Sequence, residues 1–135
     1  MPKAPINRID LYYESHGDES APAIIFAHGR GGNHLSWWQQ VAAFSGGFRC
    51  ITFDHRGWGA SAAEHGSPLR ENFIDDLTAL LDYLKIDKVF LVAQSMGGFS
   101  CLGFALAHPE RALGLVLGDT TGGVATEGTL AALKN

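Results

Sequence analysis

Ser95 lies in a sequence pattern that is typical of a nucleophilic hydroxyl. The apolar run 89–92 before it has the composition of a strand that is buried on both faces, and residues 99–107 after it form a helical pattern. A strand that turns sharply into a helix lifts a serine hydroxyl clear of the sheet. Ala93 and Gly97 flank the turn, and their small size leaves room for the strand to pack against the helix. The pattern therefore predicts Ser95 as a nucleophile that attacks a carbonyl carbon.

A glycine-rich loop over residues 28–32 (His-Gly-Arg-Gly-Gly) follows the apolar run 23–27. Glycines allow backbone N–H groups to approach a ligand closely. Acyl transfer needs such donors where negative charge develops, and one donor typically contributes about 3–4 kcal/mol of transition-state stabilisation. The N–H of Met96, directly after the predicted nucleophile, is a second expected donor. Because loops that follow parallel strands gather at one edge of a sheet, we expect these donors to meet at Ser95.

Strand and helix patterns alternate along the chain, which favours an α/β fold with a mostly parallel sheet and flanking helices. The helix with the clearest apolar stripe carries Phe73, Leu77 and Leu81 on one side. With no internal repeat evident, residues 1–135 are expected to form a single domain whose core is 1–119. Expected strands are 7–15 (an edge strand), 23–27, 48–53, 89–92 and 113–117, and expected helices are 35–44, 69–84 and 99–107.

Four motifs follow one another along the chain: His28-Gly29, 54–61 (Asp-His-Arg-Gly-Trp-Gly-Ala-Ser), 94–98 (Gln-Ser-Met-Gly-Gly) and 107–111 (Ala-His-Pro-Glu-Arg). With these motifs the chain resembles the N-terminal half of an α/β-hydrolase-fold protein. The resemblance extends over residues 6–121, nearly the whole sequence. It implies a hydrolase that acts on a small-molecule acyl substrate such as an ester, lactone or thioester.

The same resemblance implies roles for individual residues. Ser95 is the implied nucleophile, and the backbone N–H groups of Met96 and Arg30 are the implied oxyanion hole. A serine at this position disfavours the dehalogenase and epoxide-hydrolase branches, which resemble this fold but have aspartate there. The residues expected to support the two loops are His28, Gly29 and Gly97.

The family's catalytic triad is incomplete in this sequence. In the family an acid and then a histidine follow the serine. The only histidine after Ser95 is His108, which lies thirteen residues further along the predicted helix and therefore roughly 20 Å away. Asp119 is the candidate acid, with a strand-end carboxylate that binds loop amides as the alternative interpretation. We therefore expect negligible turnover by this chain alone.

The missing triad residues lead to an expectation about the extent of the domain. The resemblance implies a truncated fold that lacks the last strands, the cap and the C-terminal helices. Residues 120–135 are then expected to be the start of a cap or a frayed tail. A second function class is a short, non-catalytic binding or interaction module. In either case the strand 113–117 is an exposed apolar sheet edge, through which self-association is expected.

Other polar and aromatic residues near the same sheet edge have more than one interpretation. His28 and His55 are expected to brace loops rather than to act as bases. Asp54 and Arg56 are expected to hold their own turn, and steering of an anionic substrate is an alternative for Arg56. The three tryptophans, Trp37, Trp38 and Trp58, are either core residues or residues that line the mouth of a pocket.

Composition and charge limit the expected partners. The chain has 135 residues, of which 46% are hydrophobic and 18% charged, and its net charge is −4. No basic stripe is available for nucleic acid, and no apolar run is long enough to cross a bilayer. The N-terminus lacks the apolar region of a secretory signal, so a cytoplasmic location is expected. Cys50 and Cys101 are expected to be buried thiols, a disulfide being the alternative, and no metal or organic cofactor is expected.

Overall fold

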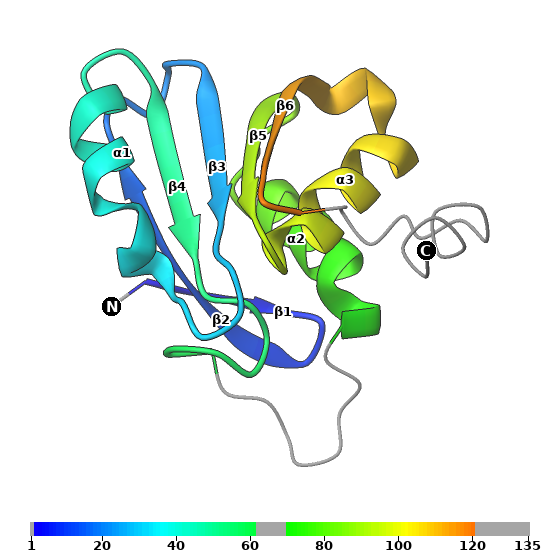
Figure 1. Ribbon diagram of the computed structural model, residues 1–135. Coiled ribbons are helices and arrows are strands. Elements are labelled where there is room, and N and C mark those ends of the chain that lie inside the picture. The colour runs from blue at the N-terminus through cyan, green and yellow to red at the C-terminus, as the bar shows by residue number, and fades with distance from the viewer. Residues whose placement is uncertain (1, 62–69, 121–135) are drawn as a thin grey trace, which may run out of the picture.

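The computed structural model describes residues 2–61 and 70–120, which form a six-stranded sheet with helices on both faces (Figure 1). The strand order across the sheet is β1-β2-β4-β3-β5-β6, and the expected α/β architecture is confirmed. The strands are β1 (Lys3–Ile6), β2 (Ile9–His16), β3 (Ala23–Ala27), β4 (Arg49–Phe53), β5 (Val89–Gln94) and β6 (Ala112–Gly118). The helices are α1 (Trp38–Phe44), α2 (Phe73–Tyr83) and α3 (Gly97–Ala107), with 3-10 turns η1 (His34–Trp37), η2 (Arg70–Asn72) and η3 (Pro109–Arg111).

The N-terminal edge of the sheet is a hairpin, where the sequence predicted a single edge strand. β1 and β2 pair antiparallel, and Asn7 and Arg8 turn the chain between them with φ angles of 44° and 65°. β1 has four residues and includes Pro5, a residue type that is confined to sheet edges. β2 consequently lies between β1 and β4, and the prediction that it is the edge strand is wrong.

β3 lies at the centre of the parallel part of the sheet. Ile25 of β3 is in register with Ile51 of β4 and with Leu91 of β5, and all three side chains are fully buried. The apolar runs of these strands fit burial on both faces. Because β3, β4, β5 and β6 run parallel, their carboxyl ends lie at the same edge, and the loops that follow them adjoin there (Figure 1).

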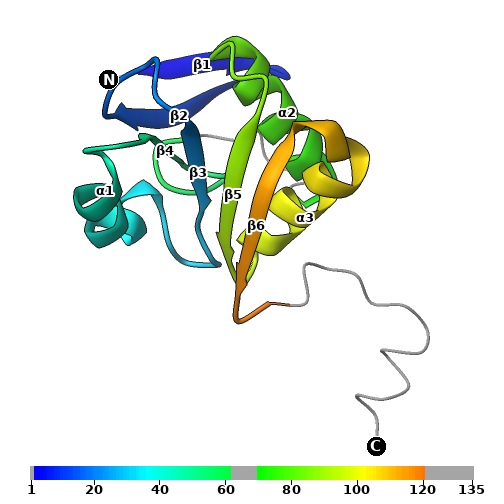
Figure 2. The ribbon, with the colours of Figure 1, turned by 90° about the horizontal axis from the view of Figure 1, so that it is seen from above.

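The helices divide between the two faces of the sheet, with α1 on one side and α2 and α3 on the other (Figure 2). The main core lies under α2 and α3 and includes Leu77, Leu91 and Phe104. A smaller cluster lies under α1, where Trp37 packs against Phe26 with 5.3 Å between ring centroids. At the start of α3, Gly97 lies against Ala27 at the end of β3, so this helix begins at the carboxyl edge of the sheet.

α1 and α2 begin later than the sequence predicted, whereas α3 begins two residues earlier than the expected helix 99–107. The expected helix 35–44 is the 3-10 turn η1 followed by α1, and the expected helix 69–84 is η2 followed by α2. Residues 62–69, on which the predicted start of the second helix falls, lie outside the described residues. The stripe expected on α2 is buried, and Asp76 is buried within it.

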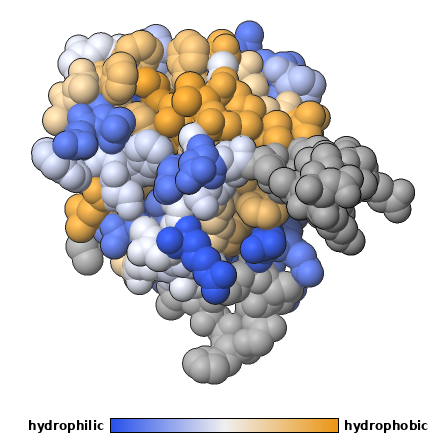
Figure 3. Space-filling view, viewed as in Figure 1, coloured by the Kyte–Doolittle hydropathy of each residue, from blue (hydrophilic) through white to orange (hydrophobic). Residues whose placement is uncertain are grey.

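β6 forms the second edge of the sheet in the described part of the chain, where it pairs with β5 alone. The side chains of Leu113, Val116 and Leu117 remain 47%, 60% and 37% exposed. Figure 3 shows an apolar area over β5 and β6 on the surface of the molecule. An apolar strand with unpaired backbone groups is a template for further strand pairing. The expected exposed edge is therefore present among the described residues.

Candidate active site

Ser95 occupies the turn between β5 and α3 with a φ angle of 50°, a conformation that non-glycine residues seldom adopt. Its N–H donates to the carbonyl of Gly118 at the end of β6 (3.0 Å), and its carbonyl accepts the N–H of Gly98 (3.0 Å). Within the described residues the Ser95 hydroxyl has no hydrogen-bond partner. The backbone of Ser95 is therefore held in place while its hydroxyl stays available.

Two glycines bring the neighbouring chain segments close to Ser95. A Cβ atom on Gly97 would overlap the backbone carbonyl of Ala27, at the end of β3. A Cβ atom on Gly29 would overlap the side chain of Gln94 and lie 3.3 Å from the Cβ of Ser95. The loop after β3 therefore lies directly against the serine turn, and the first turn of α3 lies against the end of β3.

Two backbone N–H groups near the serine turn are not used by the fold. Those of Met96 and Arg30 donate to no backbone carbonyl in the described ranges. Met96 directly precedes α3, where the first N–H groups of a helix lack intrahelical acceptors and the helix dipole is positive. Arg30 follows Gly29, which lies against Ser95. Donors placed in this way can stabilise an oxygen that becomes negative as a nucleophile attacks a carbonyl.

His28 braces the loop after β3 from inside the protein. Its side chain is fully buried, and its Nε2 accepts the N–H of His55 at 3.0 Å. The proton of the neutral ring is therefore on Nδ1, which donates to the carbonyl of Gly29 at 2.8 Å. Burial lowers the pKa of His28 below its ordinary value, which keeps this arrangement neutral. The expectation of a loop-bracing histidine agrees with these contacts.

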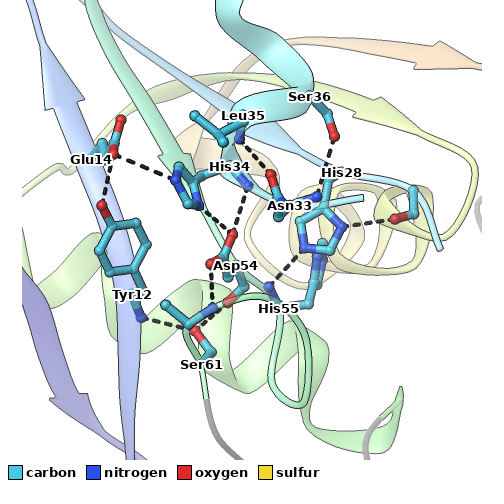
Figure 4. A network of polar contacts seen from close by, with 12 residues as sticks. Tyr12, Glu14, His28, Asn33, His34, Leu35, Ser36, Asp54, His55 and Ser61 are labelled. Atoms are coloured by element: carbon cyan, nitrogen blue, oxygen red, sulfur yellow. Dashed lines mark hydrogen bonds and ion pairs between the residues drawn. The ribbon is translucent and has the colours of Figure 1, made fainter. Parts of the chain in front are cut away.

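Asp54 joins the loops after β3 and β4 (Figure 4). Its Oδ1 accepts both the backbone N–H of His34 (2.6 Å) and the ring Nδ1 of His34 (2.8 Å). Its Oδ2 accepts the N–H of Ala60 (2.7 Å), and the backbone carbonyl of Asp54 accepts the Ser61 hydroxyl (2.7 Å). Asp54 thus holds its own turn, as the sequence predicted, and also fixes the start of η1.

The same network continues to β2 through Tyr12 and Glu14 (Figure 4). The hydroxyl of Tyr12 donates to Oε1 of Glu14 at 2.7 Å, and the N–H of Tyr12 donates to the Ser61 hydroxyl at 2.9 Å. The hydrogen bond to Glu14, together with burial, raises the pKa of Tyr12 to about 12. The loop after β4 is therefore tied to β2.

His55 connects the loop after β4 to α3. Its Nε2 lies 2.6 Å from the hydroxyl of Ser100, and both side chains are buried. Its ring stands nearly perpendicular to that of His28, with 4.5 Å between centroids. Burial, with a smaller contribution from His28, holds the pKa of His55 well below its ordinary value. His55 therefore contacts α3 one turn beyond Ser95 and braces the helix that begins there.

Arg56 forms a buried ion pair with α2. Its Nε donates to Oδ2 of Asp76 (2.8 Å) and its NH2 group to Oδ1 (2.7 Å). The same NH2 group donates to the carbonyl of Asn7 at 3.1 Å. Arg56 therefore ties its turn to α2 and to the β1–β2 hairpin, whereas the sequence predicted contacts within its own turn. The ion pair also argues against the alternative role of steering an anionic substrate.

A cavity of about 590 Å³ opens at Ser95. Of the three tryptophans, Trp58 lines it and contacts Phe73 edge-on (5.8 Å between centroids), Trp37 is in the smaller core, and Trp38 is 67% exposed. The cavity is lined by Arg30, Trp58, Arg70, Phe73, Ser95, Met96, Phe99, Asp119 and Thr120. The structure thus brings four residues from the predicted site, Ser95, Met96, Arg30 and Asp119, to one space.

Comparisons with known proteins identify the family. A family model described as alpha/beta hydrolase fold matches residues 22–133. This chain belongs to the alpha/beta hydrolase fold family. Membership of this family agrees with the strand order of the sheet and with the serine turn between β5 and α3.

Individual alpha/beta hydrolases resemble this chain over most of its length. It is 32% identical to 3-oxoadipate enol-lactonase 1 of Acinetobacter baylyi, over 87% of this chain and 44% of that protein. The structure of an enol-lactonase from Burkholderia xenovorans LB400 matches with a TM-score of 0.79 and 34% identity, over 84% of this chain and 45% of that one. An epoxide hydrolase structure from metagenomes of hot environments matches with a TM-score of 0.81 and 31% identity, over 87% and 41%. The chain therefore spans less than half the length of the relatives that it matches.

In the described part of this alpha/beta hydrolase chain, no histidine side chain contacts the Ser95 hydroxyl. His28 and His55 contact each other, Gly29 and Ser100, and His108 lies near Glu110 at 3.9 Å. Within the described residues no three side chains of the metal-ligating types form a group suited to a metal ion. In the same part of the chain, no helix has the length and apolar character required to span a membrane. The geometry present is that of a positioned hydroxyl with nearby N–H donors.

The sequence analysis missed several residues that shape the site. Arg70 and Phe99 line the cavity, and the guanidinium carbon of Arg70 lies 4.4 Å from the centroid of the Phe99 ring. Asp76 was not singled out, although it is the partner of Arg56. An acid within the apolar stripe of a predicted helix was an available signal for Asp76, since a buried carboxylate needs a partner.

Proposed function

We propose that Ser95 is the nucleophile of an acyl-bond hydrolase that acts on esters, lactones, thioesters or related bonds. In the proposed reaction the Ser95 oxygen bonds to the acyl carbon, the leaving group departs with a proton, and water later releases the acid. The backbone N–H groups of Met96 and Arg30 would hold the negative oxygen of the tetrahedral intermediate. One observation carries the proposal: the unpartnered Ser95 hydroxyl lies in a strained turn that lines the cavity.

Labelling with a fluorophosphonate tests the nucleophile. This probe bonds to an activated serine oxygen and releases fluoride, which adds a defined mass to one residue. We expect the protein, in the length that its source produces, to be labelled at Ser95 and to hydrolyse p-nitrophenyl esters. Ser95→Ala should remove both, because loss of a nucleophile typically costs several orders of magnitude in turnover. Ser45→Ala, at the end of α1, is the matched control and should retain both; labelling that persists in Ser95→Ala would refute the assignment.

We further propose that the 135-residue chain alone has negligible turnover. Within the described residues no histidine contacts the Ser95 hydroxyl, and a serine without a base is a weak nucleophile. Ester hydrolysis should therefore be near the uncatalysed background. A rate equal to that of the protein as its source produces it, and abolished by Ser95→Ala, would contradict this proposal.

The exposed edge of the sheet supports a second candidate function, a non-catalytic module that binds through β6. Leu113, Val116 and Leu117 lie exposed on this edge, and a strand from a second copy is the partner that we propose. Sedimentation should then show a dimer that Val116→Lys dissociates. A monomer at all concentrations would eliminate this candidate.

The two cysteines support a proposal about the compartment. Cys50 and Cys101 are buried free thiols, as the sequence predicted. Thiols persist where the surroundings are reducing, so we propose a cytoplasmic location. Fractionation of the source cells tests it, and recovery of the protein outside the cytoplasm would contradict it.

A further inference from the structure

The cavity at Ser95 combines an apolar wall with two arginines. Trp58, Phe73 and Phe99 supply aromatic surface, while Arg30 comes from the loop after β3 and Arg70 from the turn before α2. Two separate segments thus place positive charge around the serine turn. An apolar cavity with a few convergent polar groups is the usual form of a small-molecule site.

The position of Arg70 is set by an aromatic ring. Its guanidinium carbon lies 4.4 Å from the centroid of the Phe99 ring, in the range of a cation–π contact. An arginine in such a contact can still donate N–H groups to a ligand, because the ring occupies none of its hydrogen-bond donors. Phe99 lies in the first turn of α3, four residues after Ser95, so Arg70 is held near the start of that helix.

Neither arginine in the cavity is neutralised by the described part of the protein. Arg56 is paired with Asp76 at 2.7 Å and Arg111 with Asp82 at 2.9 Å, and both of these arginines have structural roles. By contrast, no carboxylate in the described ranges lies within ion-pair distance of the other two. Their positive charge is therefore available to a ligand.

Asp119 is the opposing charge in the same cavity. It lies at the end of β6 with a φ angle of 50°, and within the described residues it forms no ion pair. The formal charge of the described lining is then two positive groups less one negative, or +1. The excess is small, so the site should discriminate anions from neutral molecules by a modest factor.

We infer that the substrate of this site carries a carboxylate in addition to the acyl group that Ser95 attacks. The carboxylate would bind the N–H donors of Arg30 and Arg70, which match its two oxygens in shape and charge. The chain between the two groups would lie on Trp58 and Phe99. This inference rests on the proposed function for its statement about the acyl group, whereas anion binding can be measured independently of catalysis.

Paired probes test the inference by calorimetric titration of the 135-residue chain. 4-Phenylbutyrate and 4-phenylbutanamide have nearly the same shape and differ in charge. We expect the carboxylate to bind about five- to tenfold more tightly, since exposed ion pairs are weaker than buried ones. The preference should shrink between about 20 mM and about 300 mM salt because salt screens exposed charges.

Substitutions in the cavity show which residues cause the preference for the carboxylate probe. Arg30→Gln and Arg70→Gln should each reduce the preference for the carboxylate about threefold. Asp119→Asn should increase it, because a repelling charge is removed. Lys88→Gln is the matched control, since it removes one positive charge at the opposite end of β5 and should leave the preference unchanged. Equal affinity for the two probes, or a preference that both arginine variants retain, would overturn the inference.

The binding test of this inference and the labelling test of the proposed function can fail independently of each other. Ser95→Ala should retain the preference for the carboxylate, because binding requires no acyl transfer. Fluorophosphonate labelling at Ser95 without a carboxylate preference would overturn the inference and leave the proposed function in place. A preference without labelling would support the anion site and overturn the proposed function.

Discussion

Two groups of polar atoms lie in the segments that follow β3, β4 and β5, and they differ in their hydrogen bonding. The bracing group, which comprises the side chains of His28, Asp54, His55 and Arg56, is buried and hydrogen-bonded to other elements, and of these side chains only the Nδ1 atom of His55 is buried without a partner in the described residues. The open group, which comprises the Ser95 hydroxyl and the N–H groups of Met96 and Arg30, has no such partner in the described residues. In motifs that contain many polar residues, the bonded atoms position the loops, and the unbonded atoms are those available to a substrate.

The largest expected effect comes from removing Asp76, the ion-pair partner of Arg56 in the bracing group. Asp76→Ala leaves the guanidinium of Arg56 buried without its carboxylate, which should lower the free energy of unfolding by about 3–5 kcal/mol. Urea denaturation measures the change. Asp82→Ala is the control, because it breaks the exposed pair with Arg111 and should cost about 0–1 kcal/mol. Equal losses for the two variants would show that burial of the Arg56 pair is unimportant.

Gly97 tests the close contact between α3 and β3. Gly97→Ala should lower the free energy of unfolding by about 3 kcal/mol, because the added Cβ meets the rigid backbone carbonyl of Ala27. Gly47→Ala, where a Cβ meets nothing within 4 Å, should change stability by less than about 0.5 kcal/mol. Since alanine normally stabilises a helix relative to glycine, a neutral result at Gly97 would already contradict the contact.

The buried histidines make stability depend on pH. The folded-state pKa of both His28 and His55 lies below the value of 6.5 expected in the unfolded chain. Protons therefore bind preferentially to the unfolded chain, so stability should fall as the pH falls through 6.5. The loss between about pH 6.5 and about pH 5.5 can reach at most about 1 kcal/mol for each histidine, and His55, with the larger shift in pKa, should contribute more of it.

Urea denaturation at several pH values measures this dependence. His55→Phe should remove at least half of the slope between about pH 6.5 and about pH 5.5, because the pKa of His55 is lowered further than that of His28. The lowered pKa of Glu14 acts in a separate window, near and below its ordinary value of 4.5. Burial alone would raise the pKa of Glu14, but hydrogen bonds from Tyr12 and His16 outweigh it. An unchanged slope in His55→Phe would exclude His55 as a source of the dependence.

The fold was largely predictable from the sequence because its signals are local. The apolar runs at 23–27 and 89–92 and the stripe of α2 each depend on neighbouring residues, and the structure has elements at those places. β1 was missed because four residues that include Pro5 carry too little pattern. The hairpin partner that moved β2 away from the edge was therefore also missed.

The site was predictable only as far as its motifs extend. Ser95, Gly97 and Gly29 stand where the motifs indicated, although the role of Ser95 remains a prediction. The contacts between motifs were not predictable, because no local pattern tells which acid Arg56 will meet twenty positions away. Arg70 belongs to no motif, and only the three-dimensional arrangement brings it to the cavity.

The smallest effects come from two serines five positions apart. Ser100 bonds to the buried His55 at 2.6 Å, so Ser100→Ala should lower the free energy of unfolding by about 1–2 kcal/mol. The Ser95 hydroxyl has no partner in the described residues, so Ser95→Ala should change it by less than about 0.5 kcal/mol. Urea denaturation of both variants measures the difference. A clear loss of stability in Ser95→Ala would mean that this hydroxyl is part of the bracing group, and the distinction between bonded and available atoms would then fail at the residue where it matters most.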